Sequence, residues 1–144
     1  MGRATEDFIH SLESSCGSVV NSKSLDIRSY IDNMPVCLLA ADVVICRAGA
    51  MTLAELTAVG RASVLVPSPN VAENHQYHNA RVLSDAGAAQ LLEERSLTGA
   101  KLIELVDRLV SNADLRHDME IKARALGVKN ATQQIAEQVL KLLA

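Results

Sequence analysis

The sequence predicts an α/β fold in which a parallel sheet is covered by helices. From about Asp26 to the end of the chain, strand-like and helix-like segments alternate, which is typical of this architecture. The runs Val43–Ile45 and Val64–Val66 are apolar without interruption, as expected for strands buried on both faces and therefore central in the sheet. With 144 residues, 49% of them hydrophobic, the chain is long enough for one domain with a real core.

Four strands are predicted in order, each a short apolar run that ends before a turn or a helical pattern. They span Asp26–Ile31, Asp42–Cys46, Ser63–Pro67 and Ala88–Leu92. Six helices are predicted from apolar residues at three- and four-residue spacing. They span Met34–Ala40, Leu53–Val59, Glu73–Asp85, Gly99–Ser111, Asp114–Leu126 and Ala131–Leu143.

The later helices carry apolar stripes that we expect to pack on the sheet. The stripes are Leu102, Val106, Leu109 and Val110, and then Ile135, Val139, Leu142 and Leu143. Glycines mark the helix exits, where left-handed caps are expected. These glycines are Gly60, Gly87 and Gly127.

Residues 1–24 have a different character. An amphipathic helix over Thr5–Glu13 is followed by a Ser/Asn/Gly-rich loop from Ser14 to Ser24. We therefore divide the chain into a poorly determined N-terminal helix and loop, residues 1–24, and an α/β domain, residues 25–144. That domain looks incomplete at its N-terminal side, because such domains normally open with a strand. An open apolar sheet edge invites association, so we expect a partner chain, which could be a second copy, or a rearranged segment to cover it.

Composition argues against several classes of function. The net charge is −3, and only Phe8, Tyr30 and Tyr77 are aromatic, so both the basic surface and the stacking platforms of nucleic-acid binding are missing. No apolar run reaches the roughly 18–20 residues of a membrane span, and no signal peptide is apparent, so a cytoplasmic location is expected. The three cysteines lack Cys-x-x-Cys spacing, which fits a reducing compartment.

The loop that follows the Asp42–Cys46 strand is the first candidate binding segment. Gly49, between two alanines, can adopt backbone angles closed to other residues and would leave the next helix N-terminus open to an anion such as a diphosphate. The alternative is that Gly49 only makes a tight turn from strand to helix. Arg47 is a candidate phosphate contact, with a structural ion pair as the alternative. Thr52 and Glu55 fit either a capping box or, for Glu55, hydrogen bonds to a ribose diol.

The loop that follows the Ser63–Pro67 strand is the second candidate. Pro67 and Pro69 favour an extended exit from the strand, and the next helix begins with a crowd of amides and imidazoles. Such side chains suit the neutral hydroxyls of a sugar, although a solvated helix start with ordinary capping is the alternative. The polar residues are Asn74, His75, Gln76, His78 and Asn79.

Metal and cofactor chemistry is not indicated. His75 and His78 lack the spacing of a zinc-binding helix and a third ligand, so we expect no metal ion. Nucleophile-elbow, Walker A and Gly-x-Gly-x-x-Gly patterns are missing, and no cofactor or catalytic nucleophile is expected.

Four segments together resemble the MurG family, the UDP-N-acetylglucosamine transferases that convert lipid I to lipid II in bacterial peptidoglycan synthesis. The match runs in order and at the family's spacing from about Asp26 to the C-terminus. Its segments are Tyr30–Met34, Ala40–Leu56, Pro67–Ala80 and Asp85–Ala89. The resemblance implies a GT-B glycosyltransferase, of which this chain is part of the Rossmann-like C-terminal domain that holds the donor.

The resemblance also implies roles for individual residues. Ala50 and Met51, through their backbone, and Thr52 would contact uridine and diphosphate, while Glu55 would bind the ribose hydroxyls. The sugar hydroxyls would be bound from the second loop. The full set of candidate substrate-binding residues is Arg47, Gly49, Ala50, Met51, Thr52, Glu55, His75, Gln76 and Asn79.

The resemblance has gaps that limit what this chain is expected to do. The acceptor domain with its glycine-rich loops is missing, as are the opening strands of the donor domain, so the chain looks like roughly the last third of the enzyme. The general base would lie in the missing domain, and we expect weak or no UDP-GlcNAc binding and no turnover by the chain alone. In the full enzyme the implied place is the inner face of the cell membrane, with lipid I as acceptor. The alternatives are a non-catalytic binding or assembly module, or a half-enzyme for another UDP-sugar.

Overall fold

The computed structural model describes residues 11, 14, 25–28 and 30–142. The chain divides into two compact units, Met1–Met34 and Pro35–Ala144. The predicted Thr5–Glu13 helix and Ser14–Ser24 loop lie almost wholly outside the described residues, and the domain boundary after residue 24 stays a prediction. The second unit contains the sheet and both candidate loops.

A three-stranded parallel sheet forms the centre of the second unit. Its strands are β1 (Val44–Cys46), β2 (Ser63–Leu65) and β3 (Gln90–Leu91), in the order β1-β2-β3. The predicted parallel α/β fold is therefore confirmed, with strands shorter than expected. β2 is central and fully buried, as predicted. β1 was also predicted to be central, but among the described residues it pairs with β2 alone, and its Ile45 is 47% exposed.

Helices connect the strands and follow them. Two 3-10 turns, η2 (Ala72–Asn74) and η3 (Glu94–Ser96), come after β2 and β3. The α-helices are α2 (Met34–Ala40), α3 (Ala50–Val59), α4 (His75–Asp85), α5 (Gly99–Ser111), α6 (Ala113–Leu126) and α7 (Ala131–Leu142). No helix of the described segments is both long and apolar enough to cross a membrane.

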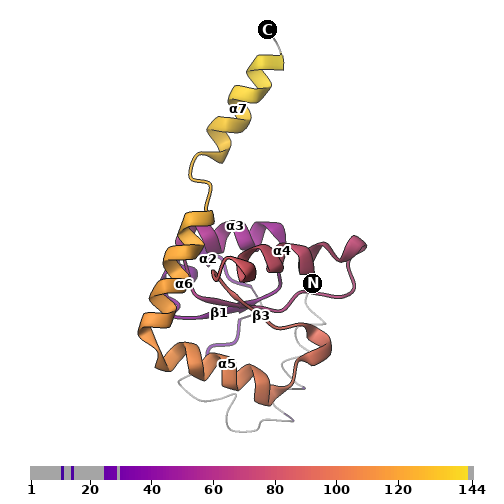
Figure 1. Cartoon of the computed structure of the whole chain (residues 1–144), viewed down its shortest axis with the longest axis vertical. Helices are drawn as coiled ribbons and strands as arrows, with labels where there is room; N and C mark the ends of the chain where they lie inside the picture. Colours follow the sequence, from indigo (N-terminus) through magenta and orange to yellow (C-terminus); the bar gives the residue numbers. More distant parts are fainter. Residues whose placement is uncertain (1–10, 12–13, 15–24, 29, 143–144) are drawn as a thin grey trace. The chain divides into compact units, whose positions relative to one another are not determined.

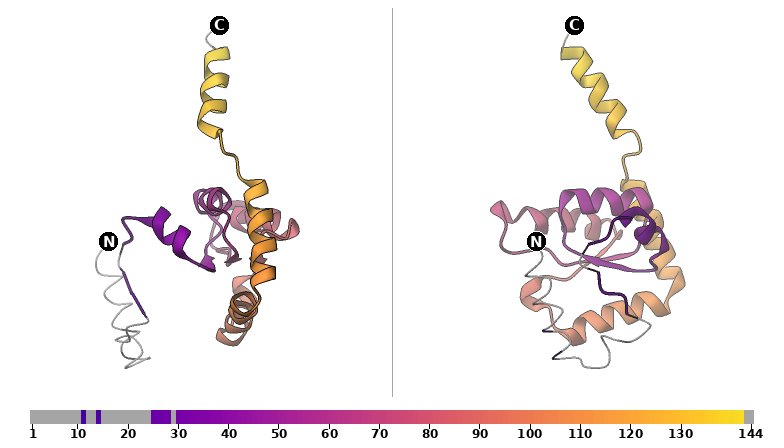
Figure 2. Two further views of the ribbon diagram at one scale, coloured as in Figure 1. Left: turned by 90° about the vertical axis from the view of Figure 1, so that its left-hand side faces the viewer. Right: turned by 180° about the vertical axis from the view of Figure 1, so that it is seen from behind.

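The core has two clusters, one on each face of the sheet, because side chains of a strand point alternately to opposite faces. On one face, Leu65 packs with buried residues of α2, α3 and α4, including Leu56. On the other face, Val64 and Val66 pack with residues of α5 and α6, including Leu109. Figure 1 shows α3 and α4 on one side of the sheet and α5 on the other, and the turned views in Figure 2 keep this order.

Two predicted elements are corrected. The described residues of Asp26–Ile31 form no strand. A strand forms only where a neighbouring strand completes its backbone hydrogen bonds, and the local sequence pattern does not show whether such a neighbour is present. The apolar stripe of α7 does not pack on the sheet: Ile135 is 65% and Leu142 86% exposed, and α7 has no buried residue. Val110, on the stripe of α5, is also exposed.

The predicted glycine caps are confirmed at two of three positions. Gly60 (φ 68°) and Gly87 (φ 71°) have left-handed backbones after α3 and α4. Gly127, after α6, has φ −72°, so the prediction of a left-handed cap is wrong there. A Cβ on Gly127 would lie 2.8 Å from the backbone oxygen of Thr57, so close passage of two backbones requires the glycine.

Replacing Ser63 with alanine is expected to raise the free energy of unfolding by about 1 kcal/mol. Ser63 is fully buried in β2, and its hydroxyl has no hydrogen-bond partner among the described residues. Folding therefore strips water from this group without replacement. Urea denaturation measures the change, with Thr57→Ala as the control, because the Thr57 hydroxyl donates to Leu53 O at 2.9 Å and its removal should destabilise. A loss of stability in Ser63→Ala would contradict the prediction.

Candidate functional site

The two candidate loops lie at the same edge of the sheet. They follow β1 and β2, which are parallel neighbours, and carboxyl ends of parallel neighbours share an edge. Two contacts join them directly: Arg47 Nη1 donates to Val66 O at 3.3 Å, and Asn79 Nδ2 of α4 donates to Ala48 O at 3.4 Å. Residues 47 and 79 are thus brought together around the first loop, although they are distant in sequence.

The N-terminus of α3 faces this edge without a side-chain cap. The helix begins at Ala50, three residues earlier than predicted, and its N-cap is Gly49. Thr52 is therefore the third residue of the helix and cannot be its cap, so the capping-box alternative for Thr52 and Glu55 is wrong. The amides of the first turn have no acceptor within the helix and carry its positive dipole end, which suits an anion. Met51 in this turn is 75% exposed.

Gly49 does not use the backbone angles that only glycine adopts readily. Its φ of −68° and ψ of 146° are open to any residue. A Cβ built there would meet only Thr52 Oγ1, at 3.9 Å, which is an ordinary contact. Neither backbone strain nor internal packing therefore requires glycine, and what the missing side chain does is leave the approach to the first turn of α3 open.

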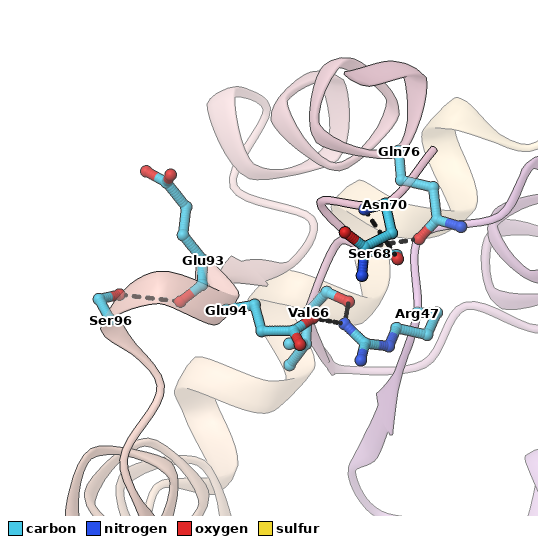
Figure 3. Close-up of polar contacts among 8 residues, drawn as sticks. All are labelled: Arg47, Val66, Ser68, Asn70, Gln76, Glu93, Glu94 and Ser96. Atoms are coloured by element: carbon cyan, nitrogen blue, oxygen red, sulfur yellow. Dashed lines mark hydrogen bonds and ion pairs between the residues drawn. The ribbon is translucent and has the colours of Figure 1, made fainter. Parts of the chain in front are cut away.

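The second loop is held by contacts between its own residues (Figure 3). Gln76 Oε1 accepts a hydrogen bond from the Ser68 amide at 2.9 Å, which directs the amide nitrogen of Gln76 away from this contact. Asn70 N lies 3.4 Å from Ser68 Oγ. His75 Nδ1 lies 2.9 Å from Ala72 O, so the ring is tied to the preceding turn and its Nε2 is left for an outside partner.

The backbone of the second loop is strained where it enters α4. Glu73 and Asn74 both have φ 52°, a left-handed conformation that costs a non-glycine residue about 1–2 kcal/mol. Glu73 and Asn74 thereby turn the chain so that His75 and Gln76 open the helix at the sheet edge. α4 consequently begins two residues later than predicted.

Glu94 is a residue of this edge that sequence reasoning missed. Its carboxylate forms an ion pair with Arg47, drawn in Figure 3. The available signal was its position two residues after the predicted Ala88–Leu92 strand, which ends at the same edge. A cavity of about 310 Å³ adjoins the second loop, and the part of its lining that follows β3, Glu93–Arg95, was missed as well. The lining residues are Pro67, Pro69, Asn74, Tyr77, Glu93, Glu94 and Arg95.

The candidate residues on α3 and α4 have different exposures. Glu55 is exposed one turn along α3 from Thr52, which is half-buried, and His75 is exposed while Gln76 is half-buried. Nearby Cys46 is not a nucleophile: burial raises the pKa of its thiol to about 11, so it stays protonated near neutral pH. The arrangement is one for binding an anion and polar groups.

Fold and site together define a class of protein, a parallel α/β domain with an anion-suited helix N-terminus and a polar second loop at one sheet edge. The model of the glycosyltransferase family 28 C-terminal domain matches residues 8–139. The chain belongs to this family, and the resemblance found in the sequence is confirmed.

Relatives make the assignment more specific. The chain is 41% identical over 138 residues, 96% of its length, to a protein of Desulforamulus reducens named UDP-N-acetylglucosamine--N-acetylmuramyl-(pentapeptide) pyrophosphoryl-undecaprenol N-acetylglucosamine transferase. It is 44% identical over 123 residues, 85% of its length, to such a transferase of Bacillus thuringiensis. The crystal structure of Acinetobacter baumannii MurG matches 81% of the chain with a TM-score of 0.75 and 35% identity. The chain spans about a third of these proteins: 37%, 34% and 33% of their lengths.

Proposed function

We propose that this chain is the donor-binding part of an inverting glycosyltransferase that moves N-acetylglucosamine from UDP-GlcNAc to lipid I, forming lipid II in peptidoglycan synthesis. One observation carries the proposal. The uncapped N-terminus of α3 and the polar start of α4 lie at one sheet edge, and the bond from Asn79 to Ala48 joins them. A sugar nucleotide has a diphosphate for the first place and a sugar for the second. The relatives' printed names supply the donor and the acceptor.

The proposed contacts are those that the family resemblance implies, and the position of the two loops at one sheet edge supports them. The backbone at Ala50 and Met51, with the Thr52 hydroxyl, binds uridine and diphosphate beside Gly49. The exposed carboxylate of Glu55 accepts hydrogen bonds from the ribose diol. From the second loop, His75, Gln76 and Asn79 bind the sugar hydroxyls, since each offers directional hydrogen bonds without a fixed charge. No metal ion or cofactor is part of the proposal.

The chemistry assigned to the chain is stabilisation of the leaving group. An acceptor hydroxyl attacks C1 of the donor sugar, the C1–O bond to UDP breaks, and negative charge grows on the diphosphate. The amides and dipole at the N-terminus of α3 offset that charge. The base that takes the acceptor proton belongs to the part of the relatives that the chain does not span. The purified chain is therefore expected to bind UDP-GlcNAc weakly or not at all and to turn none over.

Replacing Glu55 with alanine is expected to weaken UDP binding at least about tenfold, because a charge-assisted hydrogen bond to a diol is lost. Titration of the chain with UDP, monitored by amide NMR chemical shifts, measures dissociation constants as weak as the millimolar range. Glu104→Ala is the matched control. Glu104 is also exposed and is likewise the sixth residue of its helix, α5, but lies outside the candidate loops.

The titration also tests the alternatives. Shifts in the UDP titration that map to residues 49–55 and vanish in Glu55→Ala support the proposal. Absence of UDP binding at millimolar concentration in both this chain and a full-length version would overturn it in favour of a binding or assembly module. If the full-length version bound several UDP-hexoses equally well, the proposed nucleotide site would stand, but the assignment of N-acetylglucosamine as the donor sugar would be overturned.

A place at the inner face of the cell membrane is part of the proposal for the full enzyme. The acceptor in the relatives' names carries undecaprenol, a long apolar chain that partitions into a bilayer. A cytoplasmic enzyme acting on it must therefore meet the membrane surface. Fractionation of cells expressing the full-length protein, with salt extraction of the membrane pellet, tests peripheral association.

We also propose that the edge of β1 lets two copies associate. Among the described residues β1 pairs on one side only, and its Ile45 is 47% exposed. Paired edge strands would cover both features. Sedimentation velocity is expected to give a concentration-dependent dimer that Ile45→Lys removes, with Ile103→Lys, on exposed α5 surface, as control. A monomer at all concentrations would contradict this.

A further inference from the structure

We propose that Glu94, acting through Arg47, is a positioning residue that holds the two candidate loops at the spacing one sugar nucleotide requires. The proposal rests on the proposed function and assigns Glu94 no contact with the ligand. It also gives Arg47 a role that differs from phosphate binding.

The guanidinium of Arg47 joins the carboxyl ends of all three strands. Arg47 is the first residue after β1. Its Nη1 donates to the backbone oxygen of Val66, directly after β2, at 3.3 Å. The same nitrogen donates to Glu94 Oε2 at the start of η3, which follows β3. Figure 3 shows both acceptors at the end of this side chain, joined to it by dashed lines.

The first loop is consequently held from two sides. On one side Arg47 ties its beginning to β2 and η3. On the other, Asn79 of α4 donates to Ala48 O at 3.4 Å, and Ala48 is fully buried. Gly49 and the first turn of α3 follow immediately. The position of the anion-binding amides relative to α4 therefore depends on both ties.

Exposure argues for positioning rather than for a large contribution to stability. The side chain of Arg47 is 52% and that of Glu94 37% exposed, and ion pairs at such positions contribute little to folding. The pair of Arg61 and Glu120 in the same unit is 21% and 15% exposed, so it is the better candidate for a stabilising pair.

The carboxylate of Glu94 also sets the orientation of the Arg47 guanidinium. An arginine beside a diphosphate is normally drawn to it by charge. With Glu94 as a partner, the Arg47 charge is neutralised and directed toward β3, so the diphosphate is left to the amides of α3. Glu94 thus holds Arg47 in the orientation that bridges the strands.

The test compares two ligands, because only a ligand that spans both loops reports their spacing. UDP contacts the first loop alone, whereas UDP-GlcNAc contacts both. In NMR titrations of the whole chain, Glu94→Ala is expected to weaken UDP-GlcNAc about fivefold while UDP stays within about twofold. Glu94→Gln, which keeps an acceptor oxygen, should restore most of the difference.

Asp118→Ala is the matched control. The Asp118 side chain is 58% exposed and pairs with Lys122 at 2.6 Å within α6, so this ion pair joins no strands and lies outside both loops and the cavity. Asp118→Ala should leave both affinities unchanged. Amide hydrogen exchange without ligand is a second readout: residues 48–52 should exchange faster in Glu94→Ala than in Asp118→Ala.

Each result decides the proposal. Unequal loss of the two affinities with faster exchange at residues 48–52 supports it. Equal loss of both would indicate a merely structural role and overturn it. Tighter binding of both would overturn it too, because it would mean that Glu94 competes with the ligand for Arg47. If the wild-type chain binds neither ligand, the titrations are made in the full-length version, and unchanged exchange in Glu94→Ala overturns the positioning role independently of the proposed function.

Discussion

Replacing Gly49 with valine is expected to abolish measurable UDP binding while leaving the fold intact. Valine accepts the observed φ of −68° and ψ of 146°, and its Cβ would meet only Thr52 Oγ1, at 3.9 Å. The cost to stability is therefore limited to the weaker N-cap, about 0.5–1 kcal/mol. The added methyl groups would lie beside Thr52 and the first amides of α3, where the diphosphate is proposed to bind. Loss of affinity of about a hundredfold is expected when an anion can no longer reach such amides.

UDP titration and thermal denaturation of the same samples measure the two effects separately. Gly99→Val is the control, because Gly99 is the first residue of α5 and a Cβ there meets nothing within 4 Å. It should bind UDP as the wild type does. Unchanged UDP affinity in Gly49→Val would place the diphosphate elsewhere and remove the main support for the donor site. A large drop in melting temperature would instead reveal an internal reason for the glycine.

Replacing Gly127 with alanine is expected to lower the free energy of unfolding by about 1–3 kcal/mol, the usual cost of overpacking. The added Cβ would lie 2.8 Å from Thr57 O and 3.2 Å from Thr57 C. Both atoms belong to the backbone of α3, which cannot rotate aside as a flexible side chain can. Relief requires the end of α6 to move away from α3, where buried Ala123 and Leu56 belong to one core cluster.

Urea denaturation of Gly127→Ala measures this cost, with Gly99→Ala as the matched substitution. Gly99→Ala should be neutral or stabilising, because alanine loses less conformational entropy on folding and meets no atom within 4 Å. If Gly127→Ala were as stable as the wild type, the close passage of α6 over α3 would not exist in solution.

The sequence predicted the elements whose patterns are local. Helix α5, with its apolar spacing, was predicted at its observed bounds of Gly99 and Ser111, and the apolar triplet in β2 marked the buried central strand. Both candidate loops were located because each follows a strand at its carboxyl end. The roles of the residues in these loops stay predictions that ligand titration must test.

Long-range partners could not be predicted. Nothing near Arg47 in the sequence indicates Glu94, which is 47 residues away, or the contact from Asn79 to Ala48. Likewise, Asp26–Ile31 has the pattern of a strand, but strands form in pairs, and no described neighbour completes it. The exposure of the apolar stripe of α7 could not be predicted for the same reason. Amphipathic spacing shows which face of a helix is apolar, but not whether another element packs against that face.

The amino-acid sequence by itself determined the α/β class, the family and the two loops, because periodicity and short motifs are properties of neighbouring residues. Only the tertiary structure decided the start of α3 at Ala50, the ordinary backbone of Gly49, the steric role of Gly127 and the bridge from Arg47 to Glu94. These features depend on where separate segments meet in space. That meeting is set by packing across the sheet, which no local pattern encodes.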